Sequence, residues 1–397
     1  MKKTDFLNQA NELISDNPID RVSDKVKEVL ENEEAFIDSH LHIFDRKCVP
    51  IPYFRLRDKA RKTFKNADAE EIINSNEKFD TDLLKFLRIL GLSSSEKVLQ
   101  YLYKKFYNIN ETIITPLMMD LEPGWQRKAT KSIATQIKEM KALVPNYPIL
   151  PFLAIDPRRV HHYDKKNKKI IDDLYTNFLE AFTGTSPFFG VKVYPATGFL
   201  PSDSRLLPIY EICEKKSIPV TTHCGGNIIS TTINPVEYNG LDIETLEPYN
   251  SSISDTYKNK ADFFNNPQNW LAVLKKYKQL KLNFGHFGGG TAWNDVVNSK
   301  RIKDIEAMME EFNNVYGDIS FNLTQNSFMN VLNMKMTNNN KVKERTLYGT
   351  DFHVVLASKD LGKDIKRYKE KFSQWKQISR INPEKFLFEQ SYNPNLG

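Results

Sequence analysis

Two histidines stand one residue apart in the stretch FIDSHLHIFD, which covers residues 36–45. We expect a buried strand over residues 35–39 that ends in His40 and His42. Residues i and i+2 of an extended backbone point to the same side, so these two imidazoles could grip one metal ion. Asp38 and Asp45 lie close enough in sequence to orient the rings. Two surface histidines at a strand end are the alternative, because so short a motif also arises by chance.

The elements that must position these groups alternate regularly along the chain. Near-continuous apolar strands that alternate with amphipathic helices are typical of a parallel sheet covered by helices. Eight such units predict an α/β fold of the (β/α)8 TIM barrel type, with its chemistry at the C-terminal ends of the strands. A doubly wound open sheet is the alternative, but no glycine-rich phosphate-binding motif follows the first strand. The predicted strands cover residues 35–39, 112–118, 149–154, 188–194, 219–222, 282–285, 318–323 and 346–350.

Two further segments flank or interrupt the predicted barrel domain, which spans residues 35–397. Residues 1–34 read as two short amphipathic helices broken at Asn17-Pro18, and they form a predicted N-terminal helical extension on the outside of the body. Residues 46–110 are a helical insertion directly after the first strand. Its place favours a lid or pocket wall over the site, and a solvated helical excursion is the alternative.

Composition and charge limit the classes of function. The chain has 397 residues, 40% hydrophobic and 27% charged, and its net charge of +6 comes from 56 basic against 50 acidic residues. This small excess argues against nucleic acid or membrane binding as the main role. Three widely spaced cysteines imply no disulfide framework. The N-terminal stretch lacks the apolar core of a signal peptide, and no run is long enough to span a bilayer, so we expect a cytoplasmic protein.

Other polar residues occur at the strand ends where a barrel collects its catalytic groups. His223 ends the fifth strand (PVTTHCGG), His286 the sixth (LNFGHFGGG) and Asp351 the eighth (LYGTDFH). Lys192 lies within the otherwise apolar fourth strand, FFGVKVY. Because the C-terminal ends of barrel strands meet at one face, we expect these side chains to converge with the histidine pair in a metal site.

The order HxH, Lys, His, His and Asp on strands one, four, five, six and eight resembles the amidohydrolase superfamily. The quoted motifs are most similar to its amidohydrolase-related branch, which includes metal-dependent decarboxylases, and the likeness runs from about residue 35 to 355. The resemblance implies that His40, His42 and Asp351 bind one divalent ion. It implies that His223 and His286 either bind a second ion or divide the work, His223 as a ligand and His286 as a catalytic or substrate-orienting imidazole.

The resemblance also gives Lys192 two alternative roles. In two-metal members a carbamylated lysine on strand four bridges the ions, and Lys192 is the residue here that could do so. Unmodified, it could instead contact a substrate anion or pair with a buried acid. Zinc is the expected metal, and Mn²⁺ or Fe²⁺ are alternatives by ligand type.

A metal site of this kind suits hydrolysis of an amide, lactone or ester bond in a small molecule. Asp351 could take the proton of the attacking water, and His286 could stabilise the developing oxyanion. A metal-dependent non-oxidative decarboxylase acting on a small carboxylic acid is the alternative, because it uses the same ligands. A non-catalytic metal-binding barrel is the second alternative.

Two further residues are predicted to contact the substrate. Tyr194 lies two positions beyond Lys192 and would face the same side. Arg159, which follows the third strand, could clamp a carboxylate, although a solvated basic loop is the alternative there. The expected partners are a small-molecule substrate and, since dimers are common among barrels of this kind, a possible homodimer.

Overall fold

The fold is described from a computed structural model of the chain. The structure describes residues 1–50, 89, 91–160, 162–164, 169–225, 229–289, 293, 299–324, 326–357 and 360–393. Most of the predicted 46–110 insertion, including its proposed role as a lid, therefore lies outside the described residues.

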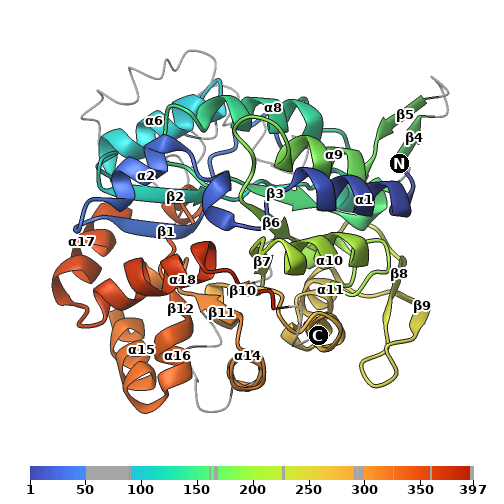
Figure 1. The fold of residues 1–397 in the computed structure, drawn as a ribbon. Helices are drawn as coiled ribbons and strands as arrows, with labels where there is room; N and C mark the ends of the chain where they lie inside the picture. Colours follow the sequence, from blue (N-terminus) through green and yellow to red (C-terminus); the bar gives the residue numbers. More distant parts are fainter. Residues whose placement is uncertain are drawn as a thin grey trace.

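Eight parallel strands form a closed barrel within the described part of the chain (Figure 1). One sheet has the order β12-β11-β10-β7-β6-β3, and β1 pairs with β2. The two sheets join where Leu150 N donates to Ile114 O at 2.9 Å, next to β3. They join again where Ser39 N donates to Tyr348 O at 2.9 Å, between β1 and β12. The strands are β1 (Phe36–Leu41), β2 (Thr112–Pro116), β3 (Phe152–Ile155), β6 (Gly190–Val193), β7 (Val220–His223), β10 (Leu282–Gly285), β11 (Val315–Asp318) and β12 (Thr346–Leu347).

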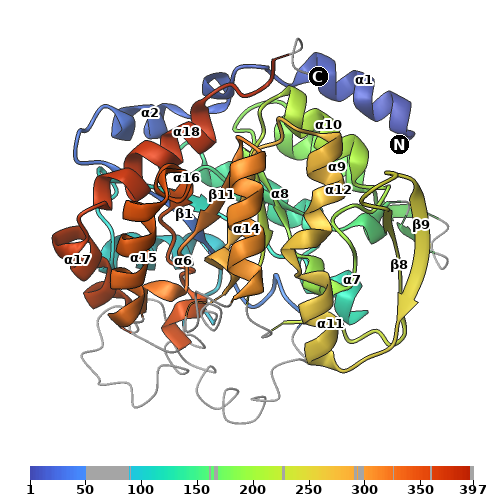
Figure 2. The same cartoon turned by 90° about the horizontal axis from the view of Figure 1, so that it is seen from below.

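Helices surround the strands in both views (Figures 1 and 2). Side-chain caps mark several of their starts: Ser132 accepts from Thr135 N at the start of α8, and Asp173 accepts from Tyr175 N at the start of α9. The α-helices are α1 (Lys3–Leu13), α2 (Asp24–Leu30), α6 (Ser95–Lys105), α7 (Glu122–Trp125), α8 (Ile133–Leu143), α9 (Leu174–Phe182), α10 (Leu207–Lys215), α11 (Tyr257–Phe264), α12 (Leu271–Lys276), α14 (Lys300–Glu311), α15 (Asn326–Asn338), α16 (Asn340–Arg345), α17 (Leu361–Lys371) and α18 (Asn382–Phe388).

Two hairpins stand apart from the barrel. The first pairs β4 (His162–Asp164) with β5 (Lys169–Asp172), and the second pairs β8 (Val236–Leu241) with β9 (Pro248–Ile253). The second hairpin lies at the edge of the molecule in Figure 2. Together with α11 it occupies the polar stretch that follows the fifth barrel strand. None of the described helices is long and apolar enough to cross a membrane.

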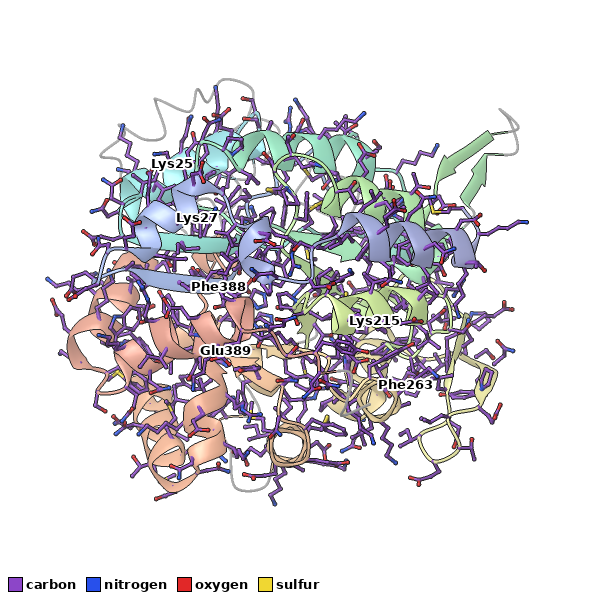
Figure 3. All side chains as sticks on the ribbon, in the orientation of Figure 1. Lys25, Lys27, Lys215, Phe263, Phe388 and Glu389 are labelled. Atoms are coloured by element: carbon purple, nitrogen blue, oxygen red, sulfur yellow. The ribbon has the colours of Figure 1, made fainter. Side chains whose placement is uncertain are left out.

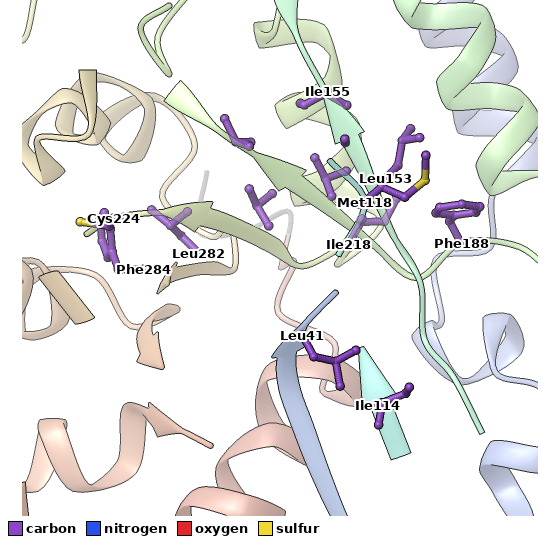
Figure 4. Packing of buried hydrophobic residues seen from close by; sticks show 14 of the residues in the cluster. Leu41, Ile114, Met118, Leu153, Ile155, Phe188, Ile218, Cys224, Leu282 and Phe284 are labelled. Carbon is purple, nitrogen blue, oxygen red and sulfur yellow. The ribbon is translucent and has the colours of Figure 1, made fainter. Parts of the chain in front are cut away.

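Apolar side chains fill the space between the strands and the helices. Figure 4 shows Leu41 and Ile114 on the neighbouring strands β1 and β2, and Leu153 and Leu282 on β3 and β10, all in one buried cluster. A second buried cluster joins the strands to α2 and α18, with members that include Val26, Ile37, Phe152, Leu347 and Phe386. The exposed side chains of α2 include Lys25 and Lys27, which Figure 3 labels.

The eight-stranded α/β barrel confirms the predicted fold, and one strand prediction is wrong. The seventh strand is Val315–Asp318 rather than residues 318–323. Ile319 and Leu323 are buried in the segment after the strand, so their apolar character reflects packing there and not a continued ladder. This difference matters for the site, because it places Asp318 at the C-terminal end of a barrel strand.

The N-terminal helix α1 packs on the outer helices α9 and α10. Phe6 is fully buried there, stacked on Tyr175 with ring centroids 4.7 Å apart and edge-on to Phe178 at 5.5 Å. The division of the chain into an N-terminal extension and a barrel domain stays a prediction.

We expect Phe6→Ala to lower the free energy of unfolding by about 3–5 kcal/mol, since it removes a buried aromatic side chain. Leu13→Ala on the same helix is the control, because Leu13 is 55% exposed and its truncation should change stability by roughly 0.5 kcal/mol or less. Urea unfolding of both variants measures the difference. Equal effects of the two changes would mean that α1 is not docked through Phe6.

Candidate metal centre

The end of β1 carries a β-bulge next to the first histidine. Asp38 pairs with Ile114 and Leu41 with Pro116, so three steps along β1 oppose two along β2. A bulge of this kind resets the alternation of side chains and is common beside active sites. Here it occurs between Asp38 and Leu41, where His40 follows in the chain.

Hydrogen bonds fix which nitrogen of each histidine faces the site. His40 Nδ1 lies 2.8 Å from the carboxylate Oδ2 of Asp318, and His42 Nδ1 lies 2.8 Å from the backbone carbonyl of Leu117. Both partners only accept, so each Nδ1 carries the proton and each Nε2 carries the lone pair in the neutral ring. Burial lowers the pKa of His40 to about 4, which keeps this imidazole in the neutral form that binds metals.

Asp351 completes a set of three facing donor atoms. Its Oδ1 lies 3.3 Å from His42 Nε2 and 3.9 Å from His40 Nε2. The three ligand atoms lie within 4.8 Å of one another, and all three residues are buried. Two nitrogen lone pairs facing a carboxylate oxygen repel one another unless a cation lies between them. Two ligands of one tetrahedral zinc ion stand roughly 3.3 Å apart, so the spacing fits such an ion.

Unpartnered buried atoms point to the same place. His40 Nε2, Asp351 Oδ1 and Lys192 Nζ have no hydrogen-bond partner among the described residues. Buried polar atoms in folded proteins are nearly always paired, so three unpaired ones in one region indicate a bound group. Burial lowers the pKa of Lys192 to about 8, although the nearby Asp318 and Asp351 act in the opposite direction. The amine is therefore easier to deprotonate than that of an exposed lysine.

His223 and His286 contact each other rather than forming one ring of ligands with the histidine pair. His286 Nε2 lies 3.1 Å from His223 Nδ1, and His223 Nε2 donates to the carbonyl of Gly225 at 2.8 Å. The His286 ring is also near His40, with centroids 4.7 Å apart. Among the described residues, His223 is not part of either group of side chains that could share an ion. With Nε2 bonded to Gly225, its predicted role as a ligand would fall to Nδ1, the nitrogen that faces His286.

Asp318 is the residue that the sequence analysis missed. Its Oδ2 accepts from His40 Nδ1 and from Asn283 Nδ2 at 2.7 Å, and its Oδ1 accepts from the backbone N–H of His286 at 3.0 Å. The N–H and hydroxyl of Ser320 also donate to Oδ1. Although Asp318 could be counted with His40 and His286 as a ligand set, five donors already occupy its oxygens. We therefore interpret it as the group that orients the ligands.

The predicted role of Asp38 and Asp45 in orienting the rings is wrong. The ring nitrogens of the histidine pair are held by Asp318 and Leu117 instead. Asp45 forms an ion pair with Lys131 at 2.6 Å. Asp38 accepts from the backbone amides of His40 and Thr350 and from two hydroxyls. Asp38, two residues before His40 on the bulged strand, thus supports the backbone and not the ring.

The two predicted substrate contacts differ in their surroundings. Tyr194 stacks on His223 with ring centroids 4.3 Å apart and packs in an apolar cluster with Met119 and Trp125. Arg159 is buried, and its guanidinium binds the carboxylates of Asp120 and Glu122, with Nη2 2.6 Å from Glu122 Oε2. Both stay predictions as substrate contacts, and Arg159 would have to recognise a substrate while it holds two acids.

A family model described as amidohydrolase matches residues 179–387, which is more than half of the 397 residues. The chain therefore belongs to the amidohydrolase family, and this identifies it as a member of the superfamily that the motifs indicated. No curated protein matches the chain.

Solved structures of several members are similar at low identity. 4-Oxalomesaconate hydratase from Rhodopseudomonas palustris has a TM-score of 0.47 and 15% identity over 89% of this chain and 95% of its own. 2,6-Dihydroxybenzoate decarboxylase in complex with 2,6-dihydroxybenzoate has a TM-score of 0.42 and 14% identity over 89% and 99%. An amidohydrolase from Burkholderia multivorans with bound zinc has a TM-score of 0.42 and 10% identity over 89% and 100%. Likeness at this level does not transfer a reaction.

We expect Asp318→Asn to destabilise the protein by about 1–3 kcal/mol, because an amide group cannot accept all the hydrogen bonds that the two carboxylate oxygens accept. We also expect it to change the tautomer of His40. Urea unfolding measures the first effect, and the ¹⁵N chemical shifts of the His40 ring measure the second. A His40 ring that keeps its proton on Nδ1 in the variant would contradict the orienting role of Asp318.

Proposed function

We propose that the protein is a metal-dependent hydrolase that cleaves an amide, lactone or ester bond of a small molecule. The single observation that carries this proposal is the convergence of His40 Nε2, His42 Nε2 and Asp351 Oδ1 at one buried point of the barrel. Zn²⁺ is the favoured ion, with Mn²⁺ or Fe²⁺ as alternatives. The described cysteines are all unpaired and buried, in keeping with the cytoplasm as our prediction for its compartment.

A divalent ion held by these ligands would lower the pKa of a water from 15.7 to about 7 and polarise a substrate carbonyl. The chain's own groups then manage the protons. The carboxylate of Asp351 lies beside both histidine ligands and can accept the proton of the attacking water. It can later deliver that proton to the leaving group.

His286, whose ring lies beside that of His40, would stabilise the oxyanion. Its Nδ1 donates to Ser320 Oγ at 2.9 Å, because that hydroxyl gives its own proton to Asp318. The ring is therefore fixed with Nε2 pointing away from Ser320, toward His223. Only as an imidazolium, with a proton on both ring nitrogens, could it donate a hydrogen bond from Nε2 to the oxyanion that forms as the carbonyl is attacked.

Non-oxidative decarboxylation of a small carboxylic acid is the second candidate, and one observation favours it. Lys192 Nζ is buried without a hydrogen-bond partner in the part of the chain that the structure describes, and such an amine suits a substrate carboxylate. The same ligand set would serve both reactions. Carbon dioxide release separates them: a panel of amides, lactones and esters tests hydrolysis, and a panel of small carboxylic acids with detection of carbon dioxide tests decarboxylation.

We expect about one zinc, manganese or iron ion per chain in protein purified without chelator, as measured by elemental analysis. His42→Ala and Asp351→Asn should each lose most of it, because each removes one of the three ligands. Asp203→Asn is the matched control, since Asp203 is an equally buried carboxylate that binds Arg205. Wild-type protein without metal after incubation with zinc or manganese would contradict the proposed centre.

Lys192→Met separates the two roles of this lysine. If Lys192 binds a substrate anion, the variant keeps its ion, and kcat/KM falls by roughly 100-fold or more because a charge-assisted contact is lost. If a carbamylated Lys192 bridges two ions, the wild type holds two ions and the variant one or none. Native mass spectrometry of the wild type detects the carbamate directly as added carbon dioxide. We expect the first result, because the buried Lys192 Nζ has no hydrogen-bond partner among the described residues and would gain one from a substrate anion.

A further inference from the structure

The first and last strands of the barrel meet at the metal centre, and we call this junction the β1–β12 seam. It consists of Asp38 to His40 on β1 and Tyr348 to Asp351 at and after the end of β12. Ser39 N donates to Tyr348 O at 2.9 Å, and Asp351 N donates to His40 O at 2.8 Å. The seam therefore carries two of the three facing ligands, one from each side. Any shift across it would change the distance between His40 and Asp351.

A single buried carboxylate spans this seam. Asp38 is fully buried, and its Oδ1 accepts from His40 N at 3.2 Å and from Thr350 N at 3.1 Å. Its Oδ2 accepts from Thr350 Oγ1 at 2.6 Å and from Tyr107 Oη at 2.7 Å. Four donors from three segments thus converge on one side chain. None of them is a metal ligand atom, although three belong to His40, which is a ligand, and to Thr350, which precedes the ligand Asp351.

The backbone at the seam departs from regular strand geometry on both sides. On β1 the bulge frees the amide of His40 from the ladder, and Asp38 Oδ1 accepts from it. Beyond β12, Asp351 has φ of 59°, in the left-handed region that residues other than glycine rarely adopt. Such a conformation persists only where its surroundings hold it. Thr350 supplies that support, since its hydroxyl donates to Asp38 and accepts from Phe352 N at 3.2 Å.

We propose that Asp38 is a positioning residue that sets the geometry of the metal centre through the backbone of the β1–β12 seam, with Thr350 and Tyr107 as its partners. It fixes the bulge that aims His40 and the turn that aims Asp351, and it does so without touching the ion. Tyr107 follows α6, so it links the end of the insertion after β1 to the same carboxylate. This inference rests on the metal centre proposed above.

The substitution Asp38→Asn is a sharp test because it changes one side of the carboxylate. The remaining oxygen can still accept from the amides of His40 and Thr350. The new NH₂ group instead faces the hydroxyls of Thr350 and Tyr107, so both hydroxyls lose the carboxylate oxygen to which they donate. Thr350→Val removes the same contact from the other side of the seam, and Thr350→Ser keeps a hydroxyl there.

The experiment measures two properties of the cobalt-substituted protein: the dissociation constant for Co²⁺, by competition with a chelating dye, and the visible absorption spectrum, which reports ligand geometry. We expect Asp38→Asn and Thr350→Val to weaken Co²⁺ binding by roughly 10–100-fold and to alter the spectrum, as changes behind a ligand do. Thr350→Ser should stay within a few-fold of wild type, with the wild-type spectrum. Thermal unfolding of the metal-free proteins is measured in parallel.

Two control variants separate positioning from general stability. Tyr107→Phe removes the hydroxyl that contacts Asp38. Tyr103→Phe removes a partly buried hydroxyl of α6 that lies outside the seam and donates to Thr112 O, with a distance of 3.2 Å between the two oxygens. We expect a weaker metal affinity and a changed spectrum only for Tyr107→Phe. Asp203→Asn serves as the control for Asp38→Asn.

The outcomes are distinct. If the wild type binds Co²⁺ but Asp38→Asn binds it equally well with the same spectrum, the inference is wrong and the metal centre stands. The inference is also wrong if Asp38→Asn loses stability and affinity only as much as Asp203→Asn does. If the wild type binds no Co²⁺, the proposed metal centre itself is wrong, and the positioning role falls with it. Tyr107→Phe and Thr350→Ser keep the test decisive if Asp38→Asn fails to fold.

Discussion

The hydrogen bond between Asp318 and His40 is the interaction on which the centre depends. It joins β11 to β1, two strands that are not neighbours in the barrel, across the interior. The same carboxylate holds the backbone of His286 and the side chain of Asn283 on β10. One charged group therefore sets the tautomer of His40 and the place of His286. Without this carboxylate, His40 and His286 would lose the partner that they share.

Burial of Asp318 opposes its ionisation, and the groups around it offset this effect. Taking a carboxylate out of water raises its pKa, yet the facing His40 and the other donors hold the pKa of Asp318 well below its usual range. Burial has the opposite effect on histidines, and it lowers the pKa values of His40 and His223. Neutral imidazoles beside ionised carboxylates form a site that attracts a cation without first having to release protons from its nitrogen ligands.

The sequence predicts the parts of the centre that follow from strand ends, and it fails where the contact is made in three dimensions. His40, His42, His286 and Asp351 could be placed because polar residues directly after apolar strands stand out, and the structure brings them together. Asp318 was hidden because the apolar residues after it shifted the predicted strand by three residues, which put its side chain at the wrong end of the barrel. The sequence also did not predict that Arg159 contacts two acids, because Asp120 and Glu122 follow a different strand.

Packing explains why the ring of His40 has so little freedom once it is bonded to Asp318. A Cβ atom added at Gly285 would come within 2.8 Å of His40 Cε1, and one added at Gly349 would come within 2.8 Å of His40 Cβ. Both distances are too short for real atoms, so only glycine lets β10 and the segment after β12 come this close to His40. His40 thus packs against two glycine residues, and its Nδ1 donates to Asp318. Because the fold already fixes the ligand, an ion would not have to supply the free energy of ordering it, which is the physical meaning of a preorganised site.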